Sequence, residues 1–209
     1  MTETIERITA GRILPVVVLE DAAGAEPLAA ALREGGLSAV EVTFRTDAAA
    51  AAIAGITKYD SSMLVGAGTV LTVEQADRAV EAGARFVVTP GFGPAVVNRC
   101  RELGVPVFPG VATATEIQMA LDAGLSTVKF FPAEQLGGVP MLKALSAPFR
   151  SVRFIPTGGV NAGNIASYLA LPSVIAVGGT WMVAPDLLAA NDWAAVTART
   201  REALGGFDA

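Results

Sequence analysis

The strongest constraint on the fold is a repeat of short apolar runs and longer amphipathic segments that continues along the whole chain. The runs are rich in Val and Ile, as strands buried on both faces of a parallel sheet usually are. The eight runs are Ile13–Leu19, Ala39–Thr43, Met63–Ala67, Arg85–Val88, Val105–Phe108, Thr127–Phe130, Arg153–Ile155 and Val174–Val177. The segments between them are rich in Ala, Leu and Glu, and each connection is long enough for a helix.

Eight consecutive strand–helix units predict an α/β fold of the (β/α)8 TIM-barrel type. The alternative is an open doubly wound sheet, which usually has fewer strands. No Pro/Ser-rich linker and no block of charge interrupts the repeat, so residues 1–209 are expected to form a single domain. Residues 1–10 are expected to form an extra helix at the bottom of the barrel and Trp193–Leu204 the last helix. Gly205–Ala209 should fray.

The composition limits the chemistry that such a barrel can perform. The chain has no histidine and a single cysteine, Cys100. A metal site with His or Cys ligands, a Ser-His-Asp triad and a Cys-His pair are therefore excluded. Lysine is scarce as well, since Lys58, Lys129 and Lys143 are the only three. Any catalysis must come from carboxylates, lysine, hydroxyl groups, arginine and backbone dipoles.

The charge and the apolar pattern narrow the range of partners. A net charge of -5 and the lack of any basic run argue against a nucleic-acid groove. No apolar stretch approaches the roughly 18 residues of a membrane helix, and residues 1–10 lack the pattern of a secretory signal. A lone cysteine cannot form an internal disulfide, so a cytoplasmic protein is expected.

Polar residues at the strand ends become the candidate site residues, because active sites of such barrels lie at the carboxyl ends of the strands. The second run ends in Glu41-Val42-Thr43-Phe44-Arg45. Alternation puts Glu41 and Thr43 on the same side of the strand. A carboxylate within an apolar strand is costly unless it is paired or functional. Glu41 is therefore either a catalytic carboxylate or one half of a buried ion pair with an arginine.

The sixth run carries the most informative residue, Lys129, which follows Val128 and precedes Phe130 and Phe131. Apolar neighbours desolvate the amine and favour its neutral form. A neutral amine can attack a ketone and form an imine, also called a Schiff base. The structural alternative is a lysine whose ammonium group reaches solvent from the strand end. The other two lysines of the chain fall on predicted helices and are expected to be solvated.

Two Gly-Gly pairs are associated with the last two strands, in Thr157-Gly158-Gly159 and in Gly178-Gly179-Thr180. In barrels of this type, the loops after the seventh and eighth strands commonly bind phosphate with backbone N–H groups and a helix N-terminus. Each pair alone could serve only a tight turn, but together they predict a phosphate site. The segments Gly66–Thr69 and Thr89–Gly93 carry weaker signals and are interpreted as shaped turns.

These strand-end segments resemble those of the bacterial class I aldolases for 2-keto-3-deoxy-6-phosphogluconate (KDPG) and 4-hydroxy-2-oxoglutarate (KHG). Gly36–Arg45 is similar to the first active-site signature of this family, and Gly124–Gly137 is similar to its Schiff-base signature. Arg153–Gly159 and Gly178–Trp181 also resemble the family, and the similarity follows nearly the whole chain in order and spacing. The resemblance implies a homotrimer of (β/α)8 barrels that needs neither a metal nor another cofactor.

The resemblance also implies a role for each strand-end residue. Lys129 would form the imine, and Glu41 would act as general acid and base. The substrate-binding residues would be Arg45 and Thr69 at the pyruvyl carboxylate, Pro90 and Phe131 in the pyruvyl pocket, Thr157 at the C4 hydroxyl, and Gly158, Gly159, Gly179 and Thr180 at the phosphate. The family often has Ser where Thr180 stands, and Thr keeps the hydroxyl.

The implied reaction is the aldolase step of the Entner–Doudoroff pathway, in which KDPG is cleaved to pyruvate and D-glyceraldehyde 3-phosphate. Cleavage of 4-hydroxy-2-oxoglutarate to pyruvate and glyoxylate is a second expected activity. Three alternatives remain open: an aldolase for the phosphogalactonate epimer, a phosphosugar isomerase, and a non-catalytic protein that binds phosphorylated metabolites. Thr157 favours the gluconate substrate, because the galactonate-type enzymes tend to have Val there. Glu41 and Lys129 argue against binding alone, which does not need both groups in one apolar pocket.

Overall fold

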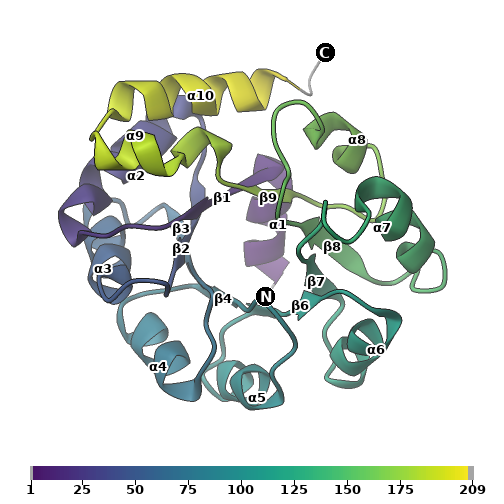
Figure 1. Ribbon diagram of the computed structural model, residues 1–209. Coiled ribbons are helices and arrows are strands. Elements are labelled where there is room, and N and C mark those ends of the chain that lie inside the picture. Colours follow the sequence, from purple (N-terminus) through teal and green to yellow (C-terminus); the bar gives the residue numbers. More distant parts are fainter. Residues whose placement is uncertain (1, 207–209) are drawn as a thin grey trace.

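The computed structural model describes residues 2–206, in which strands and helices alternate as the repeat predicts (Figure 1). The strands are β1 (Ile13–Val17), β2 (Ala39–Thr43), β3 (Leu64–Gly68), β4 (Phe86–Val88), β5 (Val107–Phe108), β6 (Gly110–Val111), β7 (Thr127–Phe130), β8 (Arg153–Pro156) and β9 (Val177–Gly179). The α-helices are α1 (Thr2–Gly11), α2 (Ala25–Gly35), α3 (Ala49–Tyr59), α4 (Val73–Glu81), α5 (Pro94–Glu102), α6 (Ala114–Asp122), α7 (Gly138–Ser146), α8 (Ile165–Leu169), α9 (Pro185–Ala189) and α10 (Trp193–Gly205). Two short 3-10 helices are η1 (Ala22–Gly24) and η2 (Trp181–Val183).

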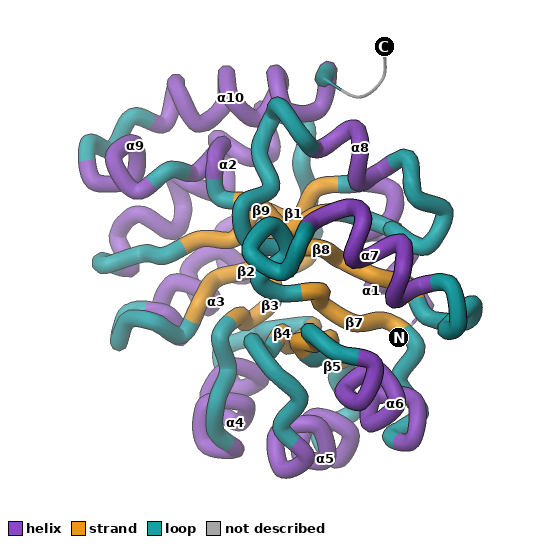
Figure 2. The backbone as a smooth tube through the Cα atoms, turned by 45° about the vertical axis from the view of Figure 1, so that its right-hand side comes forward, coloured by secondary structure: helices purple, strands orange, loops and turns teal. Residues whose placement is uncertain are grey.

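The strands form a curled parallel sheet, and most helices lie on its outside (Figures 1 and 2). Six strands pair in the order β5-β4-β3-β2-β1-β9 and three in the order β6-β7-β8, all of them parallel. Isolated bridges join Phe154 to Val174 and Thr157 to Gly178, so the chain around β8 also contacts the chain around β9. The predicted α/β class with parallel strands is therefore confirmed.

Local sequence explains where several helices begin and end. Thr72 and Thr113 precede α4 and α6, and each side chain accepts a hydrogen bond from the N–H of the third residue of its helix. Glu116 returns the bond to Thr113 and completes a capping box. Pro94 opens α5, where its missing N–H leaves no bond unmade. Gly36 directly follows α2, and its left-handed φ of 105° favours glycine.

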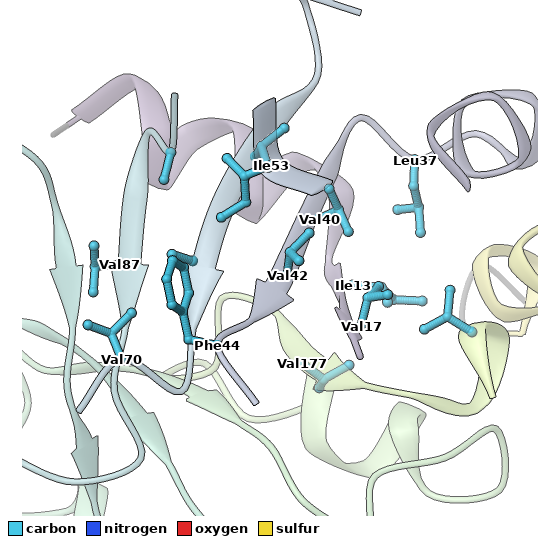
Figure 3. Close-up of a cluster of buried hydrophobic side chains, with 14 of the residues drawn as sticks. Ile13, Val17, Leu37, Val40, Val42, Phe44, Ile53, Val70, Val87 and Val177 are labelled. Carbon is cyan, nitrogen blue, oxygen red and sulfur yellow. The ribbon is translucent and has the colours of Figure 1, made fainter. Parts of the chain in front are cut away.

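The apolar side chains of the strands alternate between two clusters on opposite faces of the sheet. The larger cluster packs between the strands and the outer helices, and Figure 3 shows part of it, including Ile13, Val42 and Ile53. The smaller cluster takes one or more residues from most strands, for example Leu14 of β1 and the buried ring of Phe86 from β4. Helix α1 contributes Ile8 to this smaller cluster. Both faces of the sheet are therefore covered, as the continuous apolar runs require.

Two strands differ from their predicted form. The fifth run, predicted as Val105–Phe108, forms only the short strand β5, and a further strand, β6, follows after Pro109, which has no N–H to donate to a neighbouring strand. The prediction that Gly178 and Gly179 follow the last strand as a turn is wrong, because both residues lie within β9 and pair with Leu14 and Pro15 of β1. The strand therefore runs further toward the carboxyl end than its apolar residues indicated.

The helix that follows β8 begins only at Ile165, five positions beyond Val160. The Asn164 side chain accepts a hydrogen bond from the N–H of Asn161, and the Asn161 side chain accepts one from the N–H of Gly163. Asparagine side chains that bond to nearby backbone N–H groups stabilise a non-helical loop at the expense of the first turn of a helix. The loop after β8 is consequently longer than expected, and no helix N-terminus directly follows its glycines.

The remaining expectations concern single residues and the chain ends. Lys58 on α3 and Lys143 on α7 are exposed, as predicted, and Cys100 is buried in α5. The last helix reaches Gly205, and residues 207–209, which were expected to fray, lie outside the described residues. Within residues 2–206, no helix combines the length and the apolar character that a membrane crossing requires.

Candidate active site

The two candidate catalytic residues meet although 88 positions separate them in the chain. Glu41 points from β2 and Lys129 from β7, and the Lys129 Nζ lies 3.5 Å from the Glu41 Oε1. Only 1% of Glu41 and 5% of Lys129 is exposed. Lys129 is therefore not a lysine that reaches solvent, and the buried ion pair of Glu41 is made with this lysine rather than with an arginine.

Burial of this ion pair is difficult to explain by stability alone. Removing two charges from water costs free energy that their mutual attraction rarely exceeds, so a buried pair is weak evidence for stabilisation. The Lys129 Nζ also lies 5.0 Å from the centroid of the Phe131 ring, a distance at which a cation is attracted by the aromatic face. A buried amine and carboxylate in mutual contact at the carboxyl ends of strands is an arrangement typical of catalytic sites.

Gly68, the last residue of β3, provides the space for the Glu41 carboxylate. A Cβ atom added at Gly68 would lie 2.1 Å from the Glu41 Oε1 and 2.6 Å from its Cγ, far inside van der Waals contact. A glycine within a strand often marks such a close approach of another group. Sequence reasoning treated Gly66–Thr69 only as a shaped turn and missed this role, although the unusual glycine at a strand end was a usable signal.

Lys129 borders a cavity of about 80 Å³ at the carboxyl ends of β7, β8 and β9. The cavity brings together most of the predicted site residues. It is lined by Val16, Arg45, Lys129, Phe131, Thr157, Gly158, Gly159, Val160, Gly178, Gly179 and Thr180. The guanidinium of Arg45 adds a positive charge to the rim, and within residues 2–206 it forms no ion pair.

Three predicted site residues do not line this cavity: Glu41, which contacts Lys129 beside it, Thr69 and Pro90. Pro90 lies in a separate cavity of about 370 Å³ together with Leu71, Phe92 and Glu116, and Thr69 borders neither of the two. Thr69 directly follows β3 and has a φ of 54°, a left-handed conformation that residues other than glycine seldom adopt. Such strained residues tend to cluster at functional sites.

In the loop after β8, the glycine carbonyl groups are occupied by hydrogen bonds, whereas backbone N–H groups remain available for a ligand. The Gly158 carbonyl accepts a hydrogen bond from the backbone N–H of Glu134, and the Gly159 carbonyl accepts bonds from the side chains of Asn161 and Asn164. Within the part of the chain that the structure describes, the N–H groups of Gly159 and Val160 donate to no protein acceptor. With φ values of 98° and 79°, the two glycines form a turn whose free N–H groups suit an anion.

The Thr157 hydroxyl lies beside this loop and is buried. It donates a long hydrogen bond of 3.4 Å to the Ile155 carbonyl, which leaves its lone pairs available as acceptors. A Cβ atom at Gly178 would lie 2.2 Å from the Thr157 Oγ1, so this glycine makes room for the hydroxyl. Gly178 was predicted only as part of a turn, and its position next to Thr157 depends on the pairing of distant strands.

A family model for KDPG and KHG aldolase matches residues 4–199, nearly the whole chain. The chain belongs to this aldolase family. A 2-dehydro-3-deoxy-phosphogluconate aldolase of Treponema pallidum is 54% identical over 97% of this chain and 95% of its own length. The family resemblance noted in the strand-end segments is therefore confirmed.

Two solved structures of the aldolase family are similar over nearly their full lengths. KDPG aldolase from Legionella pneumophila, with pyruvate captured as a covalent carbinolamine intermediate, superposes with a TM-score of 0.91 at 39% identity and covers 95% of this chain and 96% of its own. KDPG aldolase from Zymomonas mobilis, in complex with 3-phosphoglycerate, has a TM-score of 0.91 at 42% identity. The match covers 97% of this chain and 95% of the Zymomonas chain.

Proposed function

We propose that this protein is a class I aldolase that cleaves KDPG to pyruvate and D-glyceraldehyde 3-phosphate and also cleaves 4-hydroxy-2-oxoglutarate to pyruvate and glyoxylate. The observation that carries the proposal is the buried contact between Lys129 and Glu41, next to a cavity that ends in the loop of Gly158 and Gly159. The name of the Treponema relative and the carbinolamine in the Legionella structure support the same chemistry.

The first half of the reaction joins the substrate to the protein. Glu41, 3.5 Å from the Lys129 amine, first takes the proton of the ammonium group, the neutral amine then attacks the C2 ketone, and Glu41 gives this proton to the new carbinolamine oxygen. Glu41 next transfers a proton from the carbinolamine nitrogen to the same oxygen, which leaves as water, so that a protonated imine and the Glu41 carboxylate remain. Formation of the positive imine nitrogen next to a buried carboxylate is favourable, because the carboxylate already lies at the place where the charge develops.

The second half breaks the carbon–carbon bond. Glu41, directly or through a water, takes the proton of the C4 hydroxyl, and the electron pair of the C3–C4 bond moves toward the protonated imine. D-Glyceraldehyde 3-phosphate leaves, and an enamine of pyruvate remains on Lys129. Protonation of the enamine at C3 and hydrolysis of the imine release pyruvate and the free amine. No step in this path requires a metal or another cofactor.

The binding roles follow from the residues around the cavity. Arg45 is the cation at its rim and would bind the substrate carboxylate, and Phe131 would pack against the pyruvyl group. Gly158, Gly159, Gly179 and Thr180 would bind the phosphate with backbone N–H groups and a hydroxyl. The roles of Thr69 at the carboxylate and of Pro90 in the pyruvyl pocket rest on the family resemblance, because neither residue lines this cavity.

We further infer that the curled sheet is a closed (β/α)8 barrel. Pro109 divides one strand into β5 and β6, so the nine strands of the structure correspond to eight. The bridges near β8 and β9 support closure on the other side. Helix α1 would be the extra helix at the amino ends of the strands. A single domain over residues 1–209, a homotrimer and a cytoplasmic location complete the proposal on the basis of the family resemblance and composition.

The alternatives differ from this proposal in covalent chemistry or in stereochemistry. A phosphosugar isomerase or a metabolite-binding protein on the same fold would use Lys129 only as a charge and would form no imine. An aldolase for the phosphogalactonate epimer would form the same imine but would select the opposite configuration at C4. Thr157 is buried beside the loop of Gly158 and Gly159, where its hydroxyl would contact the substrate chain. This position favours the gluconate substrate.

The decisive experiment is trapping of the imine with pyruvate and borohydride, followed by peptide mapping. Reduction should attach pyruvate irreversibly to Lys129, the only lysine among the three that is buried. The exposed residues Lys58 and Lys143 serve as internal controls, and Lys129→Arg should abolish the label. Labelling of another lysine, or of none, would contradict the proposed mechanism and favour the isomerase or the binding protein.

A further inference from the structure

A tyrosine and a glutamate form a contact that the proposed mechanism does not use. They lie behind the loop of Gly158 and Gly159, which we call the phosphate loop. Tyr168 lies on α8 and is completely buried, and its hydroxyl donates a short hydrogen bond to the carboxylate of Glu134. Glu134 belongs to the loop after β7, five positions beyond Lys129. The bond therefore connects the segment that follows the imine lysine with the helix that follows Gly158 and Gly159.

Glu134 contacts the phosphate loop through both its backbone and its side chain. Its N–H donates to the Gly158 carbonyl at 3.0 Å. Its Cβ and Cγ lie so close to Gly159 that a Cβ atom there would be 2.6 Å from each of them. The conformation of the Glu134 side chain and that of Gly159 are thus mutually dependent, and a change in one requires a change in the other.

The space around the hydrogen bond is equally restricted. A Cβ atom at Gly138, the first residue of α7, would lie 3.1 Å from the Glu134 Oε1 and 3.3 Å from the Tyr168 hydroxyl oxygen. Burial and the bond to Glu134 raise the pKa of Tyr168 above its ordinary value, so the hydroxyl stays protonated as a donor at neutral pH. The carboxylate is the acceptor of a charge-assisted bond, which is stronger than a bond between neutral groups.

We propose that Tyr168 and Glu134 are positioning residues for the phosphate of the substrate. By fixing the Glu134 side chain, the Tyr168 hydroxyl holds Gly158 and Gly159 in the left-handed turn whose free N–H groups border the cavity, and it keeps the carboxylate turned away from the anion. This inference rests on the proposed function for the identity of the substrate. The effect of the hydrogen bond between Tyr168 and Glu134 should apply to any phosphate bound at this loop.

The test compares Tyr168→Phe with Tyr59→Phe, which removes the hydroxyl of the other tyrosine, an exposed residue at the end of α3. The dissociation constant of inorganic phosphate is measured by calorimetry for both variants and the wild type. Tyr168→Phe should weaken phosphate binding by about threefold to tenfold, the usual effect of losing one hydrogen bond, and Tyr59→Phe should leave it unchanged. Circular dichroism monitors the fold of each variant.

The kinetic arm uses two substrates that differ in phosphate. Tyr168→Phe should raise KM for KDPG by a similar factor with little change in kcat, and should leave kcat/KM for the unphosphorylated 4-hydroxy-2-oxoglutarate unchanged. Equal losses for the two substrates would mean a general structural role and would overturn the inference. Unchanged phosphate affinity would overturn it as well.

A double-mutant cycle tests the partner independently of any loss of stability. In a Glu134→Ala background the hydroxyl has no acceptor, so adding Tyr168→Phe should change phosphate affinity by less than about twofold. If the effects of the two substitutions on phosphate affinity were fully additive, the proposed role of the Tyr168–Glu134 hydrogen bond would be refuted. If the wild type binds phosphate but traps no pyruvate on Lys129, the proposed aldolase function fails, and the same cycle on phosphate affinity still decides the inference.

Discussion

Substitution of Gly68 by alanine should displace the carboxylate of Glu41 and so disable it, although Glu41 itself is unchanged. The new Cβ atom would lie 2.1 Å from the Glu41 Oε1, whereas ordinary contacts begin at 3.4 Å, so the carboxylate must move by about 1.3 Å. The backbone of Gly68 does not have a left-handed φ, and alanine itself is therefore tolerated there. A displacement of about 1 Å in a positioned catalytic group costs on the order of 10²-fold in rate. This corresponds to about 2.7 kcal/mol of transition-state stabilisation.

The assay is kcat for KDPG cleavage, measured by coupling pyruvate release to lactate dehydrogenase. Gly91→Ala is the matched control, because a Cβ atom there meets nothing within 4 Å. It should retain wild-type kcat. The double variant of Gly68→Ala with Glu41→Gln should be about as slow as Glu41→Gln alone, since both changes disable the same group. Near-normal turnover of Gly68→Ala, or full additivity in the double variant, would refute the reasoning.

Three further predictions address the acid/base, the substrate and the fold. Glu41→Gln should keep the circular dichroism spectrum and lower kcat by about 10²–10⁴, the usual contribution of a positioned acid/base; near-normal turnover would make Glu41 a structural ion-pair partner. Thr157→Val should lower the kcat/KM preference for the gluconate over the galactonate epimer by about threefold to tenfold and leave imine trapping intact; an unmoved ratio would remove the basis for the substrate assignment. Hydrogen bonds from Ser62 and the guanidinium of Arg33 lower the pKa of Asp60 from 3.8 to about 2. Its contribution to stability is therefore present above pH 4 and is lost as pH falls through 2. Asp60→Asn should lower the free energy of unfolding at pH 7 by about 0.2–1 kcal/mol, and a deficit that is as large at pH 2 as at pH 7 would contradict this assignment.

The repeat and the chemistry of its strand ends were predictable because both depend on local sequence. Apolar runs bounded by polar segments mark buried parallel strands, and β2 and β7 have the predicted bounds. Lys129 and Glu41 could be selected because a charged residue inside an apolar strand is costly and therefore conspicuous. The same reasoning named an arginine as the ion-pair partner of Glu41, whereas the partner is Lys129, because strand β7 is distant in sequence from Glu41.

The features that sequence reasoning missed depend on contacts between distant segments. Gly68 matters because a neighbouring strand carries Glu41, and Gly178 because Thr157 lies opposite it. The contact between Tyr168 and Glu134 spans 34 positions and two different strand–helix connections. None of these pairs produces a periodic pattern, and each depends on the register between strands, which local propensities do not determine.

The contact between Lys129 and Glu41 itself depends on the curvature of the sheet. Following the pairing from β2 through β1, β9 and β8 to β7 takes four strand spacings, which at about 4.8 Å each would separate the two strands by roughly 19 Å in a flat sheet. A lysine and a glutamate side chain on the same face could not then approach within 3.5 Å. The sheet must curl until β2 and β7 face each other across its inner side, so an open doubly wound sheet would contain both residues but not the pair. The fold thus contributes to the proposed chemistry directly, because an amine and a carboxylate that are unrelated in sequence become neighbours only when the strands turn toward each other.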